Sequence, residues 1–267
     1  MRLVVVIQAR CASTRLPGKA LAPICGQPLL ARMLARVQLA REPNAIVVAT
    51  TTDSGDDPIE ALCNQLGVAV YRGHPLDCLD RHLRAGLLHN ADAVVKIPSD
   101  CPLIAPEVID RVLARFRGAR PRYDYVSNLN PPSWPDGNDV EVIDLKALQA
   151  ADAATDDPFE REHTTPFIVD HPERFRIDNV MRDDAEDLSQ RYRWVVDWPE
   201  DLRAIRLVFE ALLPSHGPGF GVDAILELYR RRPELEAINA ARRGYHYRQT
   251  RSAPAHGGHT AHTKGVA

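Results

Sequence analysis

The stretch LVVVIQARCASTRLPGKAL, Leu3–Leu21, decides the class of fold. Its first part, Leu3–Ile7, is an unbroken apolar run, which is typical of a strand buried on both faces of a sheet. The polar segment Gln8–Leu21 follows at once, so it lies at the carboxyl end of that strand, where open α/β sheets bind ligands. The stretch therefore predicts an α/β sheet with a ligand-binding loop after its first strand.

Further along the chain, apolar runs of strand length alternate with longer segments of helical period. The expected strands are 45–50, 68–71 and 93–97, and the expected helices are 28–41, one opened by 56–58, 75–90 and 106–116. Parallel strands need such long crossovers, so we predict a Rossmann-like, mostly parallel, doubly wound sheet. Later segments predict mixed or antiparallel additions at 123–128 and 140–145, a short strand at 193–196, and helices through 213 and over 222–231.

The domain organisation follows from the absence of a convincing linker or internal repeat before the last residues. We predict a single domain over 1–245, with a substrate-side insertion at about 120–190, and a disordered tail over 246–267. Four of the ten histidines lie in that tail: His246, His256, His259 and His262. A solvated terminus is the preferred interpretation, and a weak metal-binding tail is the alternative.

The charge of the chain is unevenly distributed. Its 267 residues carry a formal net charge of -3, but residues 1–41 hold seven basic and no acidic side chains, which leaves a net charge of -10 on the rest. That acidic remainder argues against nucleic-acid binding, and no apolar run approaches the roughly 18 residues of a membrane span. The five scattered cysteines indicate neither a disulfide framework nor a structural zinc site, which favours a cytoplasmic protein.

The loop after the first strand predicts a phosphate site. Its small or hydroxyl-bearing residues, which let a ligand approach the backbone, are Ala9, Ala12, Ser13 and Thr14. Its cations are Arg10, Arg15 and Lys19, and the turn Pro17-Gly18 directs Lys19 back toward the strand. Convergent Arg and Lys with backbone amides suit a triphosphate. The loop is neither a Walker A nor a GxGxxG motif, and a solvated basic turn is the alternative. The other three cations of the next segment, Arg32, Arg36 and Arg41, are expected on the solvated face of its helix.

Two aspartates are candidate metal ligands. Asp100 follows the strand 93–97, and Asp197 follows the predicted strand 193–196, so both are expected at the ligand edge of the sheet. Mg²⁺ prefers one or two carboxylates together with phosphate and water oxygens. The alternative is that both aspartates only cap the helices that begin near Pro106 and Pro199.

The opening loop resembles the signature of the sugar-acid cytidylyltransferases, which include CMP-KDO and CMP-sialate synthetases. It is most similar to the spore-coat polysaccharide branch, where IQAR–x–x–STRLPGK–x–L opens the chain. Further matching stretches are VVATTTDSGDDPI (Val47–Ile59), the RG–x(5)–LDR element (Arg72–Arg81), DCPLIAPEVID (Asp100–Asp110), PDGNDVEV (Pro135–Val142), REHTTPFI (Arg161–Ile168) and VVDWPEDL (Val195–Leu202). Together they cover about residues 3–210. The chain departs from the pattern at Ser99, where the branch has Gly, and at Cys11-Ala12, where many relatives have Met-Gly.

The resemblance implies a sheet of the nucleotide-diphospho-sugar transferase (GT-A) type and a homodimer. It implies Mg²⁺ on Asp100 and Asp197, and catalytic roles for Arg10, Arg15 and Lys19 on the phosphates of CTP. The implied nucleotide-binding residues are Ala9, Arg10, Ala12, Ser13, Thr14, Arg15, Lys19, Thr50, Asp80, Arg81 and Asp100. The implied acceptor-binding residues are Asn128, Arg161, Glu162 and His163; by its residues alone, the Arg-Glu-His run reads rather as a structural ion pair with helix capping.

The function predicted on this basis is transfer of CMP from CTP to an anionic sugar acid or related acceptor, with release of pyrophosphate, in surface polysaccharide or glycan precursor synthesis. Its partners are therefore CTP and a small anionic acceptor, with no nucleic acid and no membrane. The first alternative is a metal-dependent glycosyltransferase that uses a nucleotide sugar, although SDCPL carries one acid where a D-x-D motif is expected. A non-catalytic nucleotide-binding module is the second.

Overall fold

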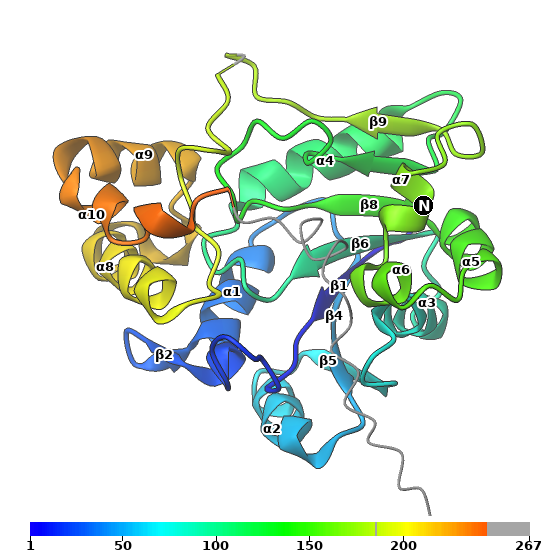
Figure 1. The fold of residues 1–267 in the computed structure, drawn as a ribbon, viewed down its shortest axis with the longest axis horizontal. Coiled ribbons are helices and arrows are strands. Elements are labelled where there is room, and N and C mark those ends of the chain that lie inside the picture. The colour runs from blue at the N-terminus through cyan, green and yellow to red at the C-terminus, as the bar shows by residue number, and fades with distance from the viewer. Residues whose placement is uncertain (185, 245–267) are drawn as a thin grey trace, which may run out of the picture.

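The apolar run that opens the chain forms strand β1, Leu3–Gln8, in the middle of the central sheet (Figure 1). The computed structural model describes residues 1–184 and 186–244. Within these residues the sheet has seven strands in the order β5-β4-β1-β6-β8-β7-β9. The other strands are β4 (Ala45–Thr51), β5 (Ala69–Gly73), β6 (Ala93–Pro98), β7 (Tyr125–Ser127), β8 (Glu141–Asp144) and β9 (Ile177–Asn179).

The direction of the strands agrees with the predicted mostly parallel sheet. β5, β4, β1 and β6 are parallel to one another, whereas β8 runs antiparallel to both β6 and β7. The register places Gln8 beside Ala49 and Pro98, so the carboxyl ends of three parallel strands meet at one edge. The predicted Rossmann-like class and its antiparallel additions are confirmed, and the loop after β1 begins at this edge of the sheet.

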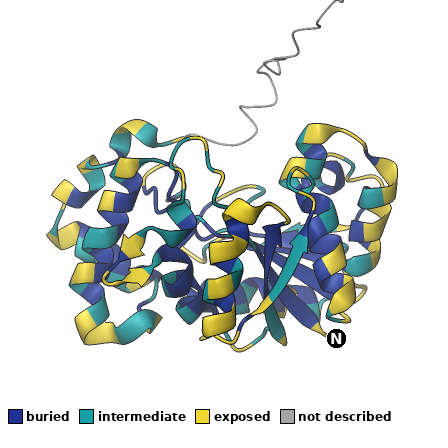
Figure 2. Ribbon diagram, turned by 90° about the horizontal axis from the view of Figure 1, so that it is seen from below, coloured by how far each residue is buried: buried dark blue, intermediate teal, exposed yellow. Residues whose placement is uncertain are grey.

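Helices cover both faces of the sheet, and alternate residues of β1 point into two separate cores. Leu3, Val5 and Ile7 pack with α1, α2, α4, α8 and α9, whereas Val4 and Val6 pack with α3, α5 and α7. Figure 2 shows the buried strands between helices whose outer surfaces are exposed. The helix bounds are α1 (Leu29–Val37), α2 (Asp57–Gln65), α3 (Cys78–Leu88), α4 (Pro106–Gly118), α5 (Leu145–Ala154), α6 (Pro158–His163), α7 (Pro166–Val169), α8 (Pro199–His216), α9 (Val222–Arg231) and α10 (Glu234–Ala237).

Short elements complete the fold. The 3-10 helices are η1 (Lys19–Leu21), η2 (Ser54–Asp56), η3 (Gly217–Gly219) and η4 (Ala240–Arg242), and β2 (Pro23–Ile24) pairs with β3 (Gln27–Pro28) in a hairpin. Among the helices of the described residues, none has the length and apolar character that a membrane span requires. The predicted tail over 246–267, with its four histidines, lies outside the described residues.

Capping residues explain where the predicted helices begin. α4 begins at Pro106, as predicted, because proline suits the first position of a helix. α3 begins at Cys78, three residues later than the pattern 75–90 suggested, because the side chain of Asp77 accepts a hydrogen bond of 2.9 Å from the backbone N–H of Asp80.

The predicted strand at Arg193–Val196 is wrong. This segment has only an isolated bridge, between Asp136 and Arg193. Its backbone bonds go to two different loops, since Trp194 N donates to Asp136 O at 2.7 Å and Val196 N donates to Asp100 O at 2.8 Å. Without one continuous neighbouring strand, the apolar run cannot form a ladder.

The predicted solvated position of Arg36 is also wrong, because this side chain is 0% exposed. Its guanidinium stacks on the ring of Phe220, with 4.0 Å to the centroid. It donates hydrogen bonds to four backbone carbonyls, those of Leu103, Ile104, Pro218 and Phe220, at 2.6–3.1 Å. A planar group with five N–H donors can satisfy that many loop carbonyls, so it joins α1 to two loops of the core. Arg41 is exposed as predicted, whereas Arg32 is half-buried.

Candidate active site

A pocket of about 570 Å³ lies at the carboxyl ends of β1 and β6, within the size range of small-molecule sites. Most of the residues singled out in the sequence line it: Ala9, Arg10, Ser13, Thr14, Arg15, Lys19, Arg81, Asp100, Asn128, Glu162, His163 and Asp197. A smaller pocket of about 120 Å³ adjoins Arg10 and is lined by Ala12, Asp53 and Leu76 among others. The cationic loop and the two candidate metal aspartates therefore share one cavity.

The loop after β1 is folded back on itself at Cys11. The backbone carbonyl of Cys11 accepts hydrogen bonds from Ser13 N at 2.8 Å and Gly18 N at 2.9 Å. Gly18 has a φ of 71°, a left-handed conformation that glycine adopts without strain, and η1 starts at the next residue. Asp56 anchors the other side, since its Oδ1 accepts from Cys11 N at 2.6 Å. This geometry explains how the Pro-Gly turn brings Lys19 back to the sheet edge; Ala12 needs no positive φ in it.

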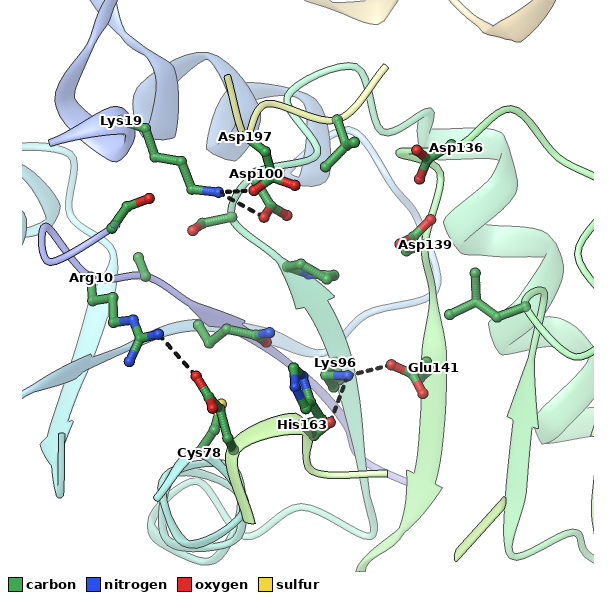
Figure 3. A pocket seen from close by; sticks show the side chains of 18 of the residues that line it. Arg10, Lys19, Cys78, Lys96, Asp100, Asp136, Asp139, Glu141, His163 and Asp197 are labelled. Atoms are coloured by element: carbon green, nitrogen blue, oxygen red, sulfur yellow. Dashed lines mark hydrogen bonds and ion pairs between the residues drawn. The ribbon is translucent and has the colours of Figure 1, made fainter. Parts of the chain in front are cut away.

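Lys19 reaches across the pocket to both candidate metal ligands (Figure 3). Its Nζ lies 2.9 Å from Asp100 Oδ2, 3.0 Å from Asp197 Oδ1 and 2.8 Å from the carbonyl oxygen of Val196. Arg15 Nη2 contacts the same Oδ1 of Asp197 at 2.6 Å. Asp100 lies just after the end of β6, as predicted, whereas Asp197 lies on a loop.

The charges of Lys19 and Asp197 are fixed at neutral pH. Burial raises the pKa of Asp197, but Lys19 and Arg15 outweigh it and bring the value down to about 2. Burial lowers the pKa of Lys19, but the carboxylates of Asp100 and Asp197 raise it above its ordinary value. An ionised aspartate and a protonated lysine are therefore paired in a site where solvent screening is weak.

Asp197 does not cap α8, so the capping alternative fails for this residue. Asp201, in the first turn of the helix, accepts hydrogen bonds of 3.0 Å from the backbone N–H groups of Asp197 and Trp198. Arg193 joins the two acids, since it contacts Asp201 at 3.0 and 3.1 Å and Asp197 Oδ2 at 3.2 Å. The carboxylate of Asp197 is thereby directed toward Arg15 and Lys19. Asp100 caps no helix either, because α4 has Ala105 at its N-cap.

The opposite end of the pocket is formed by α6 and the sheet. Arg10 Nη2 forms an ion pair of 3.1 Å with Glu162 Oε1, which joins the loop after β1 to α6. His163 lies beside Lys96, whose Nζ contacts the carbonyl oxygen of His163 at 3.1 Å. Burial and the charge of Lys96 lower the pKa of His163 to about 4, so its imidazole is neutral at pH 7.

Five charged residues of this pocket were not predicted as site residues: Lys96, Asp136, Asp139, Glu141 and Arg193. Lys96 and Glu141 form a buried pair of 2.5 Å between β6 and β8. The signal available in the sequence was a charge inside each of two strand-like runs, VVKIP and VEVI. Burial and the charge of Asp100 raise the pKa of Asp139 to about 7. Gly137 lies between Asp136 and Asp139 in the sequence and has a φ of 104°. A Cβ at this position would lie 2.7 Å from the backbone carbonyl carbon of Trp194.

The structure places four other predicted residues outside the lining of the main pocket. Ala12 lies at the smaller pocket, and Thr50 is 0% exposed within β4. Asp80 forms an ion pair with Arg84 at 2.9 Å along α3. Arg161 forms two ion pairs, with Asp77 at 2.6 Å and Asp152 at 2.7 Å, which is the structural role that its residue run suggests by itself.

This fold and site define a doubly wound α/β protein, with a cationic loop after the first strand and two carboxylates at the edge where open α/β sheets bind ligands. The chain belongs to the cytidylyltransferase family, whose model matches residues 4–231. An uncharacterized protein of Methanocaldococcus jannaschii is 32% identical over 93% of this chain and 99% of its own length. The spore coat polysaccharide biosynthesis protein SpsF of Bacillus subtilis is 28% identical over 86% of this chain and 94% of its own length.

Solved structures agree with this assignment. A cytidylyltransferase from Leptospira borgpetersenii superposes with a TM-score of 0.83 and 30% identity, covering 88% of this chain and 96% of that one. A CMP:2-keto-3-deoxy-manno-octonic acid synthetase, solved in complex with CTP, has a TM-score of 0.59 and 17% identity, covering 79% of this chain and 99% of that one. The latter likeness shows the shared fold.

Proposed function

We propose that this protein transfers CMP from CTP to an anionic sugar acid or related acceptor, with release of pyrophosphate, in the synthesis of surface polysaccharide precursors. The observation that carries the proposal is the meeting of Lys19 and Arg15 with Asp100 and Asp197 in one pocket. Membership of the cytidylyltransferase family supports the nucleotide, and the name of the Bacillus subtilis relative supports the biosynthetic setting.

A magnesium ion fits the residues at the sheet edge. Asp100 Oδ2 and Asp197 Oδ1 are hard oxygen donors that already converge on one cation, the ammonium of Lys19. The described residues contain no group of three or more His, Cys, Asp or Glu side chains that could hold a metal. Magnesium commonly binds through one or two carboxylates and takes its remaining ligands from phosphate and water. When bound, the ion would neutralise charge that develops on the phosphate oxygens.

The cationic loop supplies the rest of the electrostatics. Arg10, Arg15 and Lys19 would hold the β- and γ-phosphates, and each of them is now paired with a carboxylate that phosphate oxygens can replace. An acceptor oxygen attacks the α-phosphorus, and the bond from that phosphorus to the pyrophosphate oxygen breaks. Because the cations stabilise the departing pyrophosphate, positioning and electrostatics carry the catalysis, and the chain needs no nucleophile of its own.

The acceptor would lie at the other end of the pocket, against Asn128, Glu162 and His163, all of which line it. A neutral His163 can exchange hydrogen bonds with acceptor hydroxyl groups without adding a positive charge. When phosphate oxygens replace Glu162 as the partner of Arg10, the carboxylate of Glu162 becomes available for such contacts.

We also propose that the protein is a cytoplasmic homodimer, and light scattering on the purified full chain tests its oligomeric state.

The test is pyrophosphate release from CTP, UTP, ATP and GTP, each with a panel of sugar acids. We expect release only with CTP and one class of acceptor, and a loss of roughly 100-fold or more in Lys19→Ala and Asp100→Ala. Lys146→Ala, at an exposed position of α5, is the matched control and should keep full turnover. Unchanged turnover in both site variants would contradict the proposal. Release of a nucleoside diphosphate from a nucleotide sugar, without pyrophosphate, would establish a glycosyltransferase instead.

A further inference from the structure

Lys19 occupies the space between the two carboxylates that the proposed function assigns to a metal ion. Its ammonium contacts Asp100 Oδ2, Asp197 Oδ1 and the carbonyl oxygen of Val196, all at 2.8–3.0 Å. A lysine ammonium has three protons, so all of them have acceptors here. Any cation that binds both carboxylate oxygens at once must lie between them, where this ammonium now lies (Figure 3).

Further cations compensate the charge of Asp197. Arg15 Nη2 contacts Asp197 Oδ1 at 2.6 Å, the same oxygen that Lys19 contacts, and Arg193 Nη2 contacts Oδ2 at 3.2 Å. The side chain of Asp197 is only 9% exposed, so water screens these charges weakly. A divalent ion that approaches this site without a nucleotide therefore meets repulsion from Lys19 and Arg15 instead of an open pair of carboxylates.

We infer that Lys19 is a removable internal counter-ion, which holds Asp100 and Asp197 together before the substrate arrives and excludes the metal until a triphosphate draws the ammonium away. The inference rests on the proposed function and deepens it. Lysine has a flexible four-carbon stem, so its ammonium can move from a carboxylate to a phosphate with little change in the backbone. Lys19 and Arg15 would then bind phosphate, which would leave the carboxylates of Asp100 and Asp197 available to hold a metal ion.

The exchange orders the binding events. A metal that entered first would displace Lys19, whose side chain is 13% exposed, and would deprive its ammonium of both carboxylate acceptors in a poorly solvated place. A triphosphate supplies those acceptors, so metal and nucleotide bind together. By thermodynamic linkage, each must raise the affinity of the other by the same factor, which for such couplings is on the order of tenfold or more.

The experiment measures Mn²⁺ binding to the full chain by water-proton relaxation, which separates protein-bound Mn²⁺ from Mn²⁺ held by free nucleotide. Wild type, Lys19→Met and the exposed control Lys146→Met are each titrated with and without CTP, in the absence of an acceptor. Without CTP, we expect Lys19→Met to bind Mn²⁺ about tenfold more tightly than wild type, and Lys146→Met to match wild type. CTP should raise the Mn²⁺ affinity of wild type about tenfold, and that of Lys19→Met by a smaller factor.

Equal Mn²⁺ affinities of wild type and a folded Lys19→Met, both without CTP, would overturn the inference. If circular dichroism shows that Lys19→Met does not fold, the wild-type titrations decide: Mn²⁺ binding that CTP leaves unchanged overturns the inference, and binding that requires CTP supports it. Failure of the proposed function has a different signature, namely no pyrophosphate release with any nucleotide and acceptor. The comparison of Mn²⁺ affinities between wild type and Lys19→Met without CTP does not depend on whether pyrophosphate is released.

Discussion

Replacing Asp201 by alanine should destabilise the protein strongly, although Asp201 does not line the pocket. Its carboxylate is 0% exposed and accepts hydrogen bonds from Arg193 at 3.0 and 3.1 Å. It also accepts from the backbone N–H groups of Asp197 and Trp198, both at 3.0 Å, and from Asn239 Nδ2 at 2.9 Å. One buried acid therefore fixes the whole segment that carries Asp197 into the site.

The magnitude follows from what remains after the substitution. Breaking a buried ion pair by removal of one partner costs about 3–5 kcal/mol, because the other charge stays buried. Arg193 is 1% exposed, but it keeps Asp136 and Asp197, each at 3.2 Å. These two contacts compensate part of its charge, so we expect the lower end of the range. The predicted loss in the free energy of unfolding for Asp201→Ala is about 3 kcal/mol.

Urea denaturation followed by tryptophan fluorescence measures this loss, because the indole of Trp194 is fully buried beside the affected segment. Glu210→Ala is the control: this glutamate is exposed on the same helix, α8, and its removal should change the free energy of unfolding by less than about 0.5 kcal/mol. A loss below roughly 1 kcal/mol for Asp201→Ala, with an unchanged denaturant slope, would refute the reasoning that Asp201 holds the Arg193–Asp197 segment.

Two further predictions concern His163 and Arg36. The pKa of His163 should be about 4 rather than its ordinary 6.5, since burial and Lys96 disfavour the imidazolium while Glu162 and Glu141 only partly offset them. The unfolded chain then binds more protons between these values, so the stability contributed by the neutral imidazole is present above pH 6.5 and lost as the pH falls toward 4. An NMR titration checks this, with the resonance assigned by its absence in His163→Gln, and a midpoint near 6.5 would contradict it. Arg36→Met should lower the free energy of unfolding by more than about 3 kcal/mol in urea, because it removes the donor of three buried carbonyls and one half-buried carbonyl. A loss under about 1 kcal/mol would show that these bonds contribute little.

The sequence was sufficient for the parts of the site that depend on local pattern. A short continuous apolar run is typical of a strand covered on both faces, so Leu3–Ile7 predicted such a strand, and its carboxyl end fixed the place of the loop that follows. Pro17 and Gly18 predicted the turn that returns Lys19 to the sheet. Asp100 was placed correctly for the same reason, because it lies two residues after the apolar strand β6.

Tertiary structure decided everything that depends on partners far apart in the chain. Asp197 lies in the site on a loop that Asp201 and Arg193 hold in place. The hydrophobic periodicity of the sequence does not predict the contact between Asp201 and Arg193. The sequence pattern predicted a solvated position for Arg36. In the folded chain, its guanidinium instead contacts loop carbonyls of residues that are 67 to 184 positions away in the sequence.

The sequence by itself determined the class of sheet and the place of the cationic loop at the carboxyl end of β1, because hydrophobic period and turn chemistry act over a few residues. Only the tertiary structure decided which charges meet. Lys19 lies 81 positions from Asp100 and 178 from Asp197, yet one ammonium contacts both. Such pairings arise from the packing of helices and loops around the sheet, and Coulomb energy depends on the distance between atoms rather than on their separation along the chain.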